Sequence, residues 1–381
     1  MDWLTAEEAL AILQTKPQTL YANVSRGRVR SKPFPDDPRR SLYKSEDVYR
    51  LAERRPGRKR ERAVAADTIR WGLPIMRSAI STVTDGRLLY RGYDASDLSP
   101  TATLEDVVAL LWQAEPNERD LEIMDNREAV DGHPLERLFK VFGIRAANDL
   151  PSMGRSPSIL KREAWDILQL FHDTVLGAQT VRGLLHEHIA QTWDRPDAAD
   201  TIRRALVLLA DHELNASAFA ARVTASTGAP LSAAVLSGLS ALIGPLHGRA
   251  ATATAAIVER ARLVGAEEAI RLNLLHGTPL QSFGHLLYRE TGDIRASLLL
   301  ADLELPSQYL ELQHHAAEIL GEKPNVDFAL SAIAEIYDLP PNAPLYLFAL
   351  ARIVGWLAHA LEQAESGSLI RPRAEFIPPI E

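Results

Sequence analysis

Apolar residues recur every three or four positions through most of the chain beyond residue 63. This spacing places them on one face of a helix, so the pattern predicts an all-α body. Strands do not alternate with the helices and no glycine-rich phosphate loop is visible, which argues against a nucleotide-binding α/β fold. The predicted helices span residues 104–113, 135–142, 161–176, 200–214, 231–242, 250–263, 267–275, 296–303, 308–320, 327–336 and 345–365.

One short segment, 79–90, breaks this helical pattern. Ser, Thr and Val residues flank the pair Asp85-Gly86. An Asp-Gly pair between two such segments is typical of the turn of a β-hairpin. The sequence therefore predicts one hairpin ahead of the helical body.

The first 53 residues have a different pattern. A helix is predicted over 4–13, with Thr5 and Glu8 spaced as a capping box, and a second short helix over 18–25. A hairpin or wing follows Gly27, and a third helix starts at Ser45. This order resembles the winged helix-turn-helix of the MerR/excisionase kind, whose second helix would enter the DNA major groove. The basic residues of its predicted surface are Arg26, Arg28, Arg30, Lys32, Arg39, Arg40 and Lys44.

Net charge separates the same two regions. The chain of 381 residues carries −8, but residues 1–62 contain 15 Lys/Arg against 9 Asp/Glu, a balance of +6 that leaves −14 for the rest. A basic module ahead of an acidic body indicates that the module meets a polyanion such as DNA. The alternative is a protein-contacting module whose charges are merely solvated.

Composition restricts the chemistry and the compartment. The chain has no cysteine, which excludes a disulfide framework, a thiolate metal site and a thiol nucleophile. No apolar run approaches about 18 residues, so no membrane span is expected. The N-terminal segment carries acids where an export signal has bases. We therefore expect a cytoplasmic protein with no membrane partner.

Polar groups interrupt the predicted helices at several places. His247 follows Gly244-Pro245 and precedes a helix, where the helix dipole disfavours a charged imidazolium. Asp327 lies at a helix start, where the dipole favours the ionised carboxylate. The other interruptions are DHELN at 211–215, SFGH at 282–285, Tyr288-Arg289, Asp293-Ile294-Arg295, Arg352 and Arg371.

These residue types suit carbonyl chemistry on a carboxylate-rich substrate. An ionised aspartate can remove a proton next to a carbonyl, and neutral histidines can polarise carbonyl oxygens. Arginine binds carboxylates through two parallel hydrogen bonds. Metal binding is the rival use of histidine, but the pairs His186/His188 and His314/His315 lack a helix-spaced third ligand. We expect both pairs on helix surfaces and no metal site.

Five of these motifs occur in a fixed order that resembles the citrate synthase family. They are DHELNAS, GPLHG, FGH with the following tyrosine and Asp-x-Arg, NVDF, and the terminal Arg-Pro. The segment GRLLYRGYDASDL at 86–98, followed by LEDVVALLW, is similar to the N-terminal region of that family. The likeness covers about residues 70–376. It implies a two-domain all-α homodimer whose small domain closes over oxaloacetate and acetyl-CoA. A helix-turn-helix ahead of such a body also resembles some bacterial members.

By this resemblance, three residues would carry the reaction. Asp327 would be the base that takes a proton from the acyl-CoA methyl group, and His247 would stabilise the resulting enol through the thioester oxygen. His285 would polarise the oxaloacetate ketone, which the enol carbon attacks to give citryl-CoA and then citrate by hydrolysis. A closed, dry site would strengthen these hydrogen bonds.

The resemblance also implies five substrate-binding residues. His212, Arg295 and Arg352 would hold the oxaloacetate carboxylates. Arg371 would reach in from the partner subunit, and Arg289 would lie near the CoA phosphates. No cofactor is implied beyond the coenzyme A thioester, which is itself a substrate.

The chain departs from the family pattern at a few positions near these residues. Arg249 follows GPLHG, Ser282 stands where a glycine is usual, and one extra residue with Ile294 lies before Arg295. The C-terminal segment has Phe376 where a tyrosine is usual. These changes concern substrate and rate more than fold.

The predicted domains are a winged helix-turn-helix over 1–53, a linker over 54–62, a large helical domain over 63–230 and 340–381, and a small domain over 231–339. The predicted function is condensation of acetyl-CoA with oxaloacetate. One alternative is 2-methylcitrate synthesis from propionyl-CoA, which differs by one methylene, worth about 1–3 kcal/mol in a pocket. The other is a DNA-binding regulator whose synthase-like body senses a CoA ester or dicarboxylate without turnover.

Overall fold

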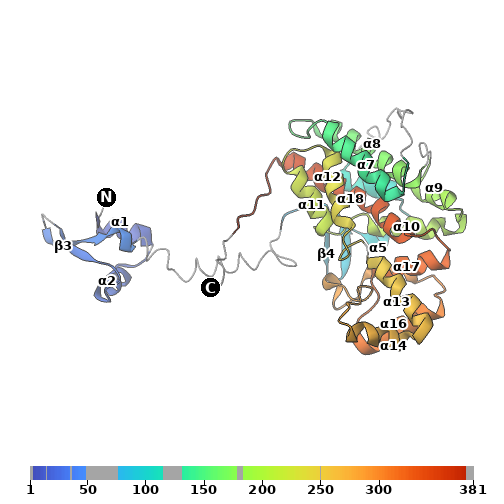
Figure 1. Cartoon of the computed structure of the whole chain (residues 1–381). Coiled ribbons are helices and arrows are strands. Elements are labelled where there is room, and N and C mark those ends of the chain that lie inside the picture. The colour runs from blue at the N-terminus through green and yellow to red at the C-terminus, as the bar shows by residue number, and fades with distance from the viewer. Residues whose placement is uncertain are drawn as a thin grey trace. The chain divides into compact units, whose positions relative to one another are not determined.

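The computed structural model describes residues 3–13, 15–34, 37–48, 76–114, 131–177, 183–248 and 250–374. The chain divides into two compact units, Met1–Arg77 with Arg373–Glu381 and Ser78–Pro372 (Figure 1). The predicted linker, 54–62, lies outside the described residues. The four domain boundaries drawn from the sequence stay predictions.

The described part of the N-terminal unit contains two complete helices, the first residues of a third helix at 45–48, which begins at Ser45 as predicted, and a three-stranded antiparallel sheet. Its elements are β1 (Trp3–Leu4), α1 (Ala6–Leu13), α2 (Pro17–Ser25), β2 (Ser31–Phe34) and β3 (Asp37–Lys44), with strand order β1-β3-β2. The predicted capping box is confirmed, because Glu8 N donates to Thr5 Oγ1 at 3.3 Å and Thr5 N donates to Glu8 Oε2 at 2.8 Å. The first helix begins after Thr5 because Leu4 pairs with Tyr43 in the sheet. Leu4, Leu13, Leu20 and Tyr43 form part of its small core.

The body opens with the predicted hairpin. Strand β4 (Ser81–Thr84) pairs antiparallel with β5 (Arg87–Tyr90), which pairs with β6 (Tyr93–Asp94). The turn residues Asp85 and Gly86 both have positive φ, at 51° and 73°. Two successive positive φ values are what a two-residue hairpin turn of this kind needs, and Asp-Gly is a preferred pair for it.

Helices make up most of the rest of the described body. They are α5 (Ala95–Leu98), α6 (Leu104–Trp112), α7 (Pro134–Asn148), α8 (Pro157–Leu176), α9 (Leu185–Thr192), α10 (Ala199–Leu209), α11 (Ala216–Ala225), α12 (Leu231–Leu242), α13 (Ala250–Val264), α14 (Ala266–Leu275), α15 (Ile294–Leu300), α16 (Ser307–Leu320), α17 (Val326–Ile336) and α18 (Ala343–Ser366). Short 3-10 helices η2 (Pro196–Ala198) and η3 (Leu286–Tyr288) complete them. The largely helical prediction for the body is confirmed.

Several details of the helix prediction were wrong. Helix α7 ends at Asn148 rather than at residue 142. Helix α10 ends at Leu209 rather than at residue 214, and the left-handed backbone of Glu213, with φ of 51°, does not allow a helix to continue through residue 214. The chain then starts a separate helix, α11, whose N-cap Asn215 accepts hydrogen bonds from Ser217 N and Ala218 N. Helices α5, α9 and α11 were not predicted. Their short lengths of 4, 8 and 10 residues contain few repeats of the helical period.

The body contains two apolar cores. The larger one is formed by α6–α12, α18 and neighbouring elements, and includes Leu239 and Trp356. The second joins α13, α14, α16 and α17 through residues such as Ile257, Tyr309 and Phe328. Figure 1 shows α13, α14 and α16 together at one end of the body, with α18 and α12 close to each other in the remainder. The site residues described below come from both groups of helices.

Helix α18 lies in the larger core. Among the described residues it is the one helix long and apolar enough to cross a membrane, and 83% of its most apolar stretch is buried inside the protein. Such burial is typical of the core helix of a folded domain. Close packing is possible because Gly238 has no side chain: a Cβ there would lie 2.6 Å from the Trp356 ring.

Candidate active site

His212 lies in the turn between α10 and α11 and is 5% exposed. Its Nε2 is 2.9 Å from the Tyr288 hydroxyl, and its ring centroid is 5.1 Å from that of His285. Burial, reinforced by the nearby arginines and histidines, lowers the pKa of His212 well below its usual value. His212 is therefore a neutral hydrogen-bonding group at neutral pH.

His285 is brought into the site by a short backbone bridge. Gly284 N donates to Lys323 O at 2.8 Å, and Asn325 N donates to Ser282 O at 3.0 Å. The SFGH and NVDF segments, about 40 residues apart in sequence, are thereby joined in front of α17. Burial and the positive charge of Arg295 lower the pKa of His285 to about 4, so this ring is also neutral.

Asp327 is the second residue of α17. The Asn325 side chain caps the helix and accepts a hydrogen bond from Asp327 N at 3.1 Å. Burial raises the pKa of Asp327 to about 7, with a further increase from Asp293, although Arg295 and Arg352 act in the opposite direction. The sequence emphasised the helix start, which favours the ionised carboxylate, but burial has the largest effect on this pKa and acts in the opposite direction. A carboxyl group with this pKa is suited to exchange protons near neutral pH.

Arg295 is held by its neighbour Asp293. Arg295 Nε and Nη2 donate to the two Asp293 oxygens at 2.9 and 2.8 Å, and both side chains are nearly inaccessible to solvent. Burial lowers the pKa of Arg295, but Asp293 more than offsets this and the net change is upward. The guanidinium carbon lies 5.7 Å from the Tyr288 ring centroid. The extra residue before Arg295 therefore does not carry it away from His212 and His285.

Arg352, in the middle of α18, is 1% exposed. Its Nε donates to Leu209 O at 2.8 Å, and its guanidinium carbon lies 4.6 Å from the Phe348 ring centroid. Within the part of the chain that the structure describes, Arg352 Nη2 is buried without a hydrogen-bond partner. Burial lowers the pKa of Arg352 to about 10, so it remains a cation at neutral pH. This leaves a buried positive group ready to bind an anion.

His247 lies in the turn between α12 and α13. Its Nε2 is 2.8 Å from the Ser217 hydroxyl, and its ring centroid is 5.9 Å from that of Phe348, which also contacts Arg352. Burial and Arg352 lower the pKa of His247 to about 4. The predicted neutral ring is confirmed, but burial has the largest effect rather than the position before a helix.

Six predicted residues, then, share one site: His212, His247, His285, Arg295, Asp327 and Arg352. Sequence reasoning gave no role to three residues that support them, namely Asp293 beside Arg295, Ser217 beside His247, and Phe348 between His247 and Arg352. Ser217 and Asp293 lie inside the motifs DHELNAS and DIR, and that placement was the available signal. Phe348 had none beyond its distance of one helical turn from Arg352.

Two other predicted residues are not part of this cluster in the single chain. Arg289 is exposed directly after η3, and Arg371 is exposed beyond the end of α18. Both stay predictions.

Of the departures from the family pattern, Ser282 is buried and its Oγ lies 2.7 Å from Thr254 Oγ1, so its hydroxyl is satisfied within the protein. Arg249 and Phe376 fall outside the described residues.

The arginines predicted to contact DNA differ in their hydrogen-bond partners and in how far the structure describes them. Arg26 and Arg28 are exposed just after α2. Arg30 instead pairs with the buried Asp47, its Nε donating to Asp47 Oδ2 at 2.7 Å, so a structural ion pair takes part of its hydrogen-bonding capacity. Arg39 and Arg40 lie on β3, and their side chains are outside the described set.

The histidine pairs also differ. His186 is buried, so its predicted place on a helix surface was wrong. His314 is on the surface of α16, with its side chain 66% exposed, as predicted. His314, His315 and Glu318 have ligand atoms within 4.8 Å of one another. The expectation that this pair lacks a helix-spaced third group was wrong, because Glu318 follows His314 by four residues and His315 by three. The cluster is largely exposed on a single helix.

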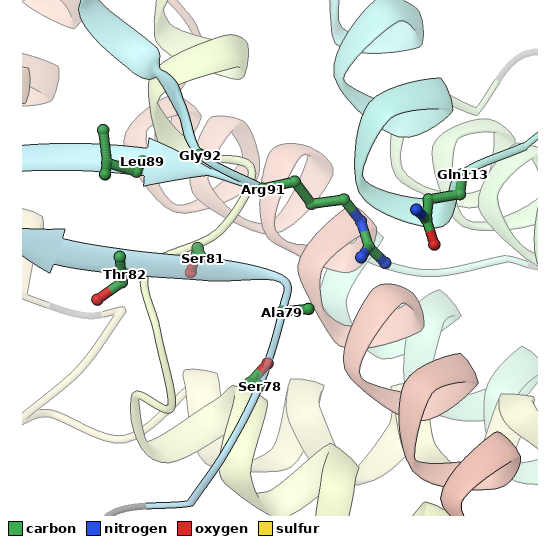
Figure 2. Close-up of a pocket in the computed structure, with 8 residues that line it drawn as sticks. All are labelled: Ser78, Ala79, Ser81, Thr82, Leu89, Arg91, Gly92 and Gln113. Carbon is green, nitrogen blue, oxygen red and sulfur yellow. The ribbon is translucent and has the colours of Figure 1, made fainter.

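A separate pocket lies beside β4, the strand that contacts the His212 turn. A pocket of about 420 Å³ is lined by Ser78, Ala79, Ser81, Thr82, Leu89, Arg91, Gly92 and Gln113. Figure 2 shows Arg91 extending from the end of β5 toward Gln113, with Ser81 and Thr82 on the neighbouring strand. None of the six clustered residues lines it. It opens instead onto the strand that contacts the His212 turn.

Comparison with known proteins identifies the family of the chain. The family model "Citrate synthase, C-terminal domain" matches residues 69–162 and 167–373. The chain belongs to the citrate synthase family. It is therefore an enzyme of the citrate synthase type, and the resemblance stated from its motifs is confirmed.

Individual relatives cover most of the chain. Citrate synthase 2 of Bacillus subtilis is 30% identical over 353 residues, which are 81% of this chain and 95% of that protein. The 2-methylcitrate synthase of Mycobacterium tuberculosis is 27% identical, over 80% of this chain and 88% of that protein. The crystal structure of citrate synthase from Thermotoga maritima superimposes with a TM-score of 0.65 at 25% identity, covering 81% of this chain and 95% of the other.

Proposed function

We propose that this enzyme condenses acetyl-CoA with oxaloacetate to give citrate and coenzyme A. The observation that carries the proposal is a single buried site that combines a carboxyl group of pKa about 7, neutral histidines and the Nη2 of Arg352. These are the groups that deprotonation of a thioester and polarisation of a ketone require. Citrate synthases are among the most similar relatives.

The reaction would begin with proton removal. Asp327 takes a proton from the methyl group of acetyl-CoA, and the electron pair moves into an enol whose oxygen is stabilised by His247. The enol carbon then bonds to the ketone carbon of oxaloacetate, while His285 donates a hydrogen bond to the ketone oxygen as it becomes an alkoxide. Water hydrolyses the resulting citryl-CoA thioester, which releases citrate and coenzyme A.

The protonation of His247 depends on its partner Ser217. The single hydroxyl hydrogen of Ser217 has two acceptors at 2.8 Å, Asn215 Oδ1 and His247 Nε2. Asn215 Oδ1 also accepts from Ser217 N and Ala218 N, each at 3.1 Å. We propose that the hydroxyl hydrogen is donated to His247 Nε2 during the reaction, which leaves the ring hydrogen on Nδ1. Nδ1–H is then the donor available for the thioester oxygen. Because the ring is neutral over the physiological range, it donates without becoming an imidazolium.

Oxaloacetate would be held by Arg352, Arg295 and His212. Arg352 offers Nη2, whereas Arg295 already uses two of its N–H groups on Asp293. We therefore assign the stronger carboxylate contact to Arg352. Arg289, exposed beyond η3, would meet the phosphates of coenzyme A.

We also propose a homodimer in which Arg371 of the partner subunit completes the site. Large apolar side chains remain exposed around the end of α11: Met153 is 74% exposed, Leu150 69% and Leu369 60%. They are neighbours, because a Cβ on Gly228 would touch Met153 and Ile370 N donates to Ser226 Oγ at 3.1 Å. An exposed apolar patch of this kind is typical of a protein interface.

The test is release of coenzyme A from acetyl-CoA, and separately from propionyl-CoA, with oxaloacetate and a thiol-reactive dye. The enzyme has no cysteine and adds no background. Turnover with acetyl-CoA supports the proposal, whereas turnover with propionyl-CoA alone would assign 2-methylcitrate synthesis instead. Asp327→Asn should lower kcat by about 10³-fold, because the amide is no base. Unchanged turnover in that variant would show that Asp327 is not the base.

A second function is proposed for the N-terminal unit: a winged helix-turn-helix that binds DNA. Helix α2 exposes Tyr21, 55% accessible, and the chain exposes Arg26 and Arg28 just beyond it, ahead of the β2–β3 hairpin. Exposed bases beside an exposed helix can bind phosphates while the helix contacts the groove. A regulator that senses substrate without turnover would need the same surface.

Retention on DNA should fall steeply with salt and disappear when residues 1–62 are deleted. Arg26→Ala with Arg28→Ala should weaken retention, whereas Arg271→Ala, an exposed arginine of α14, should not. If the deleted protein is retained as well as the full chain, the unit does not bind DNA. Turnover with folded protein excludes the regulator without catalysis.

A further inference from the structure

The turn that carries His212 is held by other parts of the chain rather than by its own backbone. Glu213, directly after His212, has φ of 51°, a left-handed conformation that is unfavourable for a residue with a side chain. Helix α10 has ended at Leu209 and α11 begins at Ala216, so no helical hydrogen bonds continue through the turn. Contacts from outside must therefore keep His212 in place.

Ser81, on β4, contacts both sides of this turn. Its hydroxyl donates to Asp211 Oδ2 at 2.5 Å and accepts from Glu213 N at 2.8 Å. The two bonded residues are the ones immediately before and after His212. The Glu213 side chain returns to the same strand, where its Oε1 accepts from Val83 N at 2.6 Å. The positive φ of Glu213 is thus supported by hydrogen bonds to β4.

The residue opposite Ser81 in the hairpin supports the same turn. Tyr90 is the registered partner of Ser81 on β5, and its hydroxyl lies 2.9 Å from Val207 O and 3.3 Å from Asp211 O. One pair of hairpin residues therefore binds the last turn of α10 and both neighbours of His212.

Asp211 is fixed from the opposite direction by α18. Its Oδ2 is 3.2 Å from His359 Nε2, and His359 Nδ1 is 3.1 Å from Arg222 Nη1. Because the arginine must donate, Nδ1 accepts and the ring hydrogen lies on Nε2, directed to Asp211. Gly355 lets α18 approach this closely, since a Cβ there would lie 2.2 Å from Asp211 Oδ1. Asp211 is thus oriented, and Ser81 connects it to Glu213.

We infer that Ser81 is a positioning residue for oxaloacetate, acting through His212. The inference rests on the proposed role of His212 in holding that substrate. Without the hydroxyl, Glu213 N loses its acceptor and Asp211 loses a donor, so the turn can relax and His212 can leave its place beside Tyr288 and His285. Coenzyme A does not contact this turn in the proposed mechanism, so the effect should be selective for oxaloacetate.

The experiment compares steady-state kinetics of Ser81→Ala and Thr84→Ala in the full chain. Thr84 is an exposed residue on the same strand and serves as the matched control. Ser81→Ala should raise KM for oxaloacetate about tenfold, as expected for one lost hydrogen bond to a strained turn, and change kcat and KM for acetyl-CoA less than about threefold. Ser81→Thr, which keeps the hydroxyl, should restore most of the affinity.

His212→Ala separates failure of the inference from failure of the proposed function. If His212→Ala raises KM for oxaloacetate but folded Ser81→Ala does not, Ser81 has no positioning role while the function stands. If His212→Ala leaves that KM unchanged, the assigned role of His212 is wrong and the inference fails with it. Equal rises in both KM values for Ser81→Ala would indicate a merely structural residue and overturn the inference. Should Ser81→Ala not fold, Tyr90→Phe replaces it, with the same selective rise expected.

Discussion

Arg295 and Arg352 are both almost completely buried and both contribute to one site, but they are held in different ways. Arg295 donates two hydrogen bonds to Asp293, which lies two residues before it. Arg352 has one backbone carbonyl, that of Leu209, and the face of Phe348. The charge of Arg295 is balanced by Asp293 within the protein. In Arg352, Nη2 is left available for a ligand.

The pKa values reflect this difference. Burial lowers the pKa of both guanidinium groups, yet the net shift is upward for Arg295, which Asp293 neutralises. For Arg352 the net shift is downward to about 10, because the opposing charge of Asp211 does not offset burial. A buried cation whose desolvation is not offset costs stability, and a bound dicarboxylate would reduce that cost. The comparison shows that equal burial does not mean equal function. Arg295 stabilises the structure of the site, whereas Arg352 is available to bind substrate.

The largest expected effect comes from breaking the buried ion pair between Asp293 and Arg295. Asp293→Ala leaves Arg295 buried and unpaired and removes the acceptor of Val326 N, so the free energy of unfolding should fall by about 3–5 kcal/mol. Urea denaturation measures this loss. Asp302→Ala is the control, because Asp302 pairs with Arg204 at the surface with its side chain 76% exposed, and it should change stability by less than about 1 kcal/mol. Equal losses in the two variants would contradict the distinction.

Removing the charge of Arg352 should weaken oxaloacetate binding more than it lowers the free energy of unfolding. Arg352→Gln should raise KM for oxaloacetate about 100-fold, as expected for loss of a charge-assisted contact to a carboxylate. Its free energy of unfolding without substrate should fall much less than that of Asp293→Ala, since a buried charge is removed as well. Thermal unfolding with and without oxaloacetate measures both quantities. A variant that oxaloacetate still stabilises as strongly as the wild type would show that Arg352 does not bind it.

The smallest expected effect is a shift in the pH profile of kcat/KM, and its direction differs between a variant of Arg352 and a variant of Asp293. Because Asp327 has a pKa of about 7, kcat/KM should rise about tenfold from pH 6 to pH 8 as the base ionises. Arg352 lowers the pKa of Asp327 and Asp293 raises it. Arg352→Gln should therefore move the profile to higher pH, and Asp293→Asn to lower pH. Shifts in the same direction in both variants would refute the assignment of the profile to Asp327.

The raised pKa of Asp327 also makes the free energy of unfolding depend on pH. The value of about 7 in the folded protein lies above the ordinary 3.8, so folding favours the protonated carboxyl. The contribution of Asp327 to stability is full below about pH 4 and is lost as pH rises through about 7. In Asp327→Asn this loss should be absent, which denaturation at pH 5 and pH 8 measures.

Much of the fold and of the site was predictable because the signals are local. The helical period, the Asp85-Gly86 turn and the Thr5/Glu8 capping box each depend on residues a few positions apart, and the structure contains all three. The motifs named the six residues that cluster in the site. Their ionisation was less predictable: for Asp327, the local signal of a helix start pointed to an ionised group, and burial by distant residues had the larger effect.

Residue order alone therefore specified a largely helical body, its hairpin and the identity of the site side chains, since periodicity, turn chemistry and motif order are properties of neighbouring residues. Only folding in three dimensions determined which arginine is neutralised, why the histidines are neutral, and that Ser81 supports a histidine 131 positions later in the chain. The reason is that desolvation and hydrogen-bond partners depend on which distant segments pack together, and Gly355, Phe348 and Tyr90 set those contacts without a sequence signal for them.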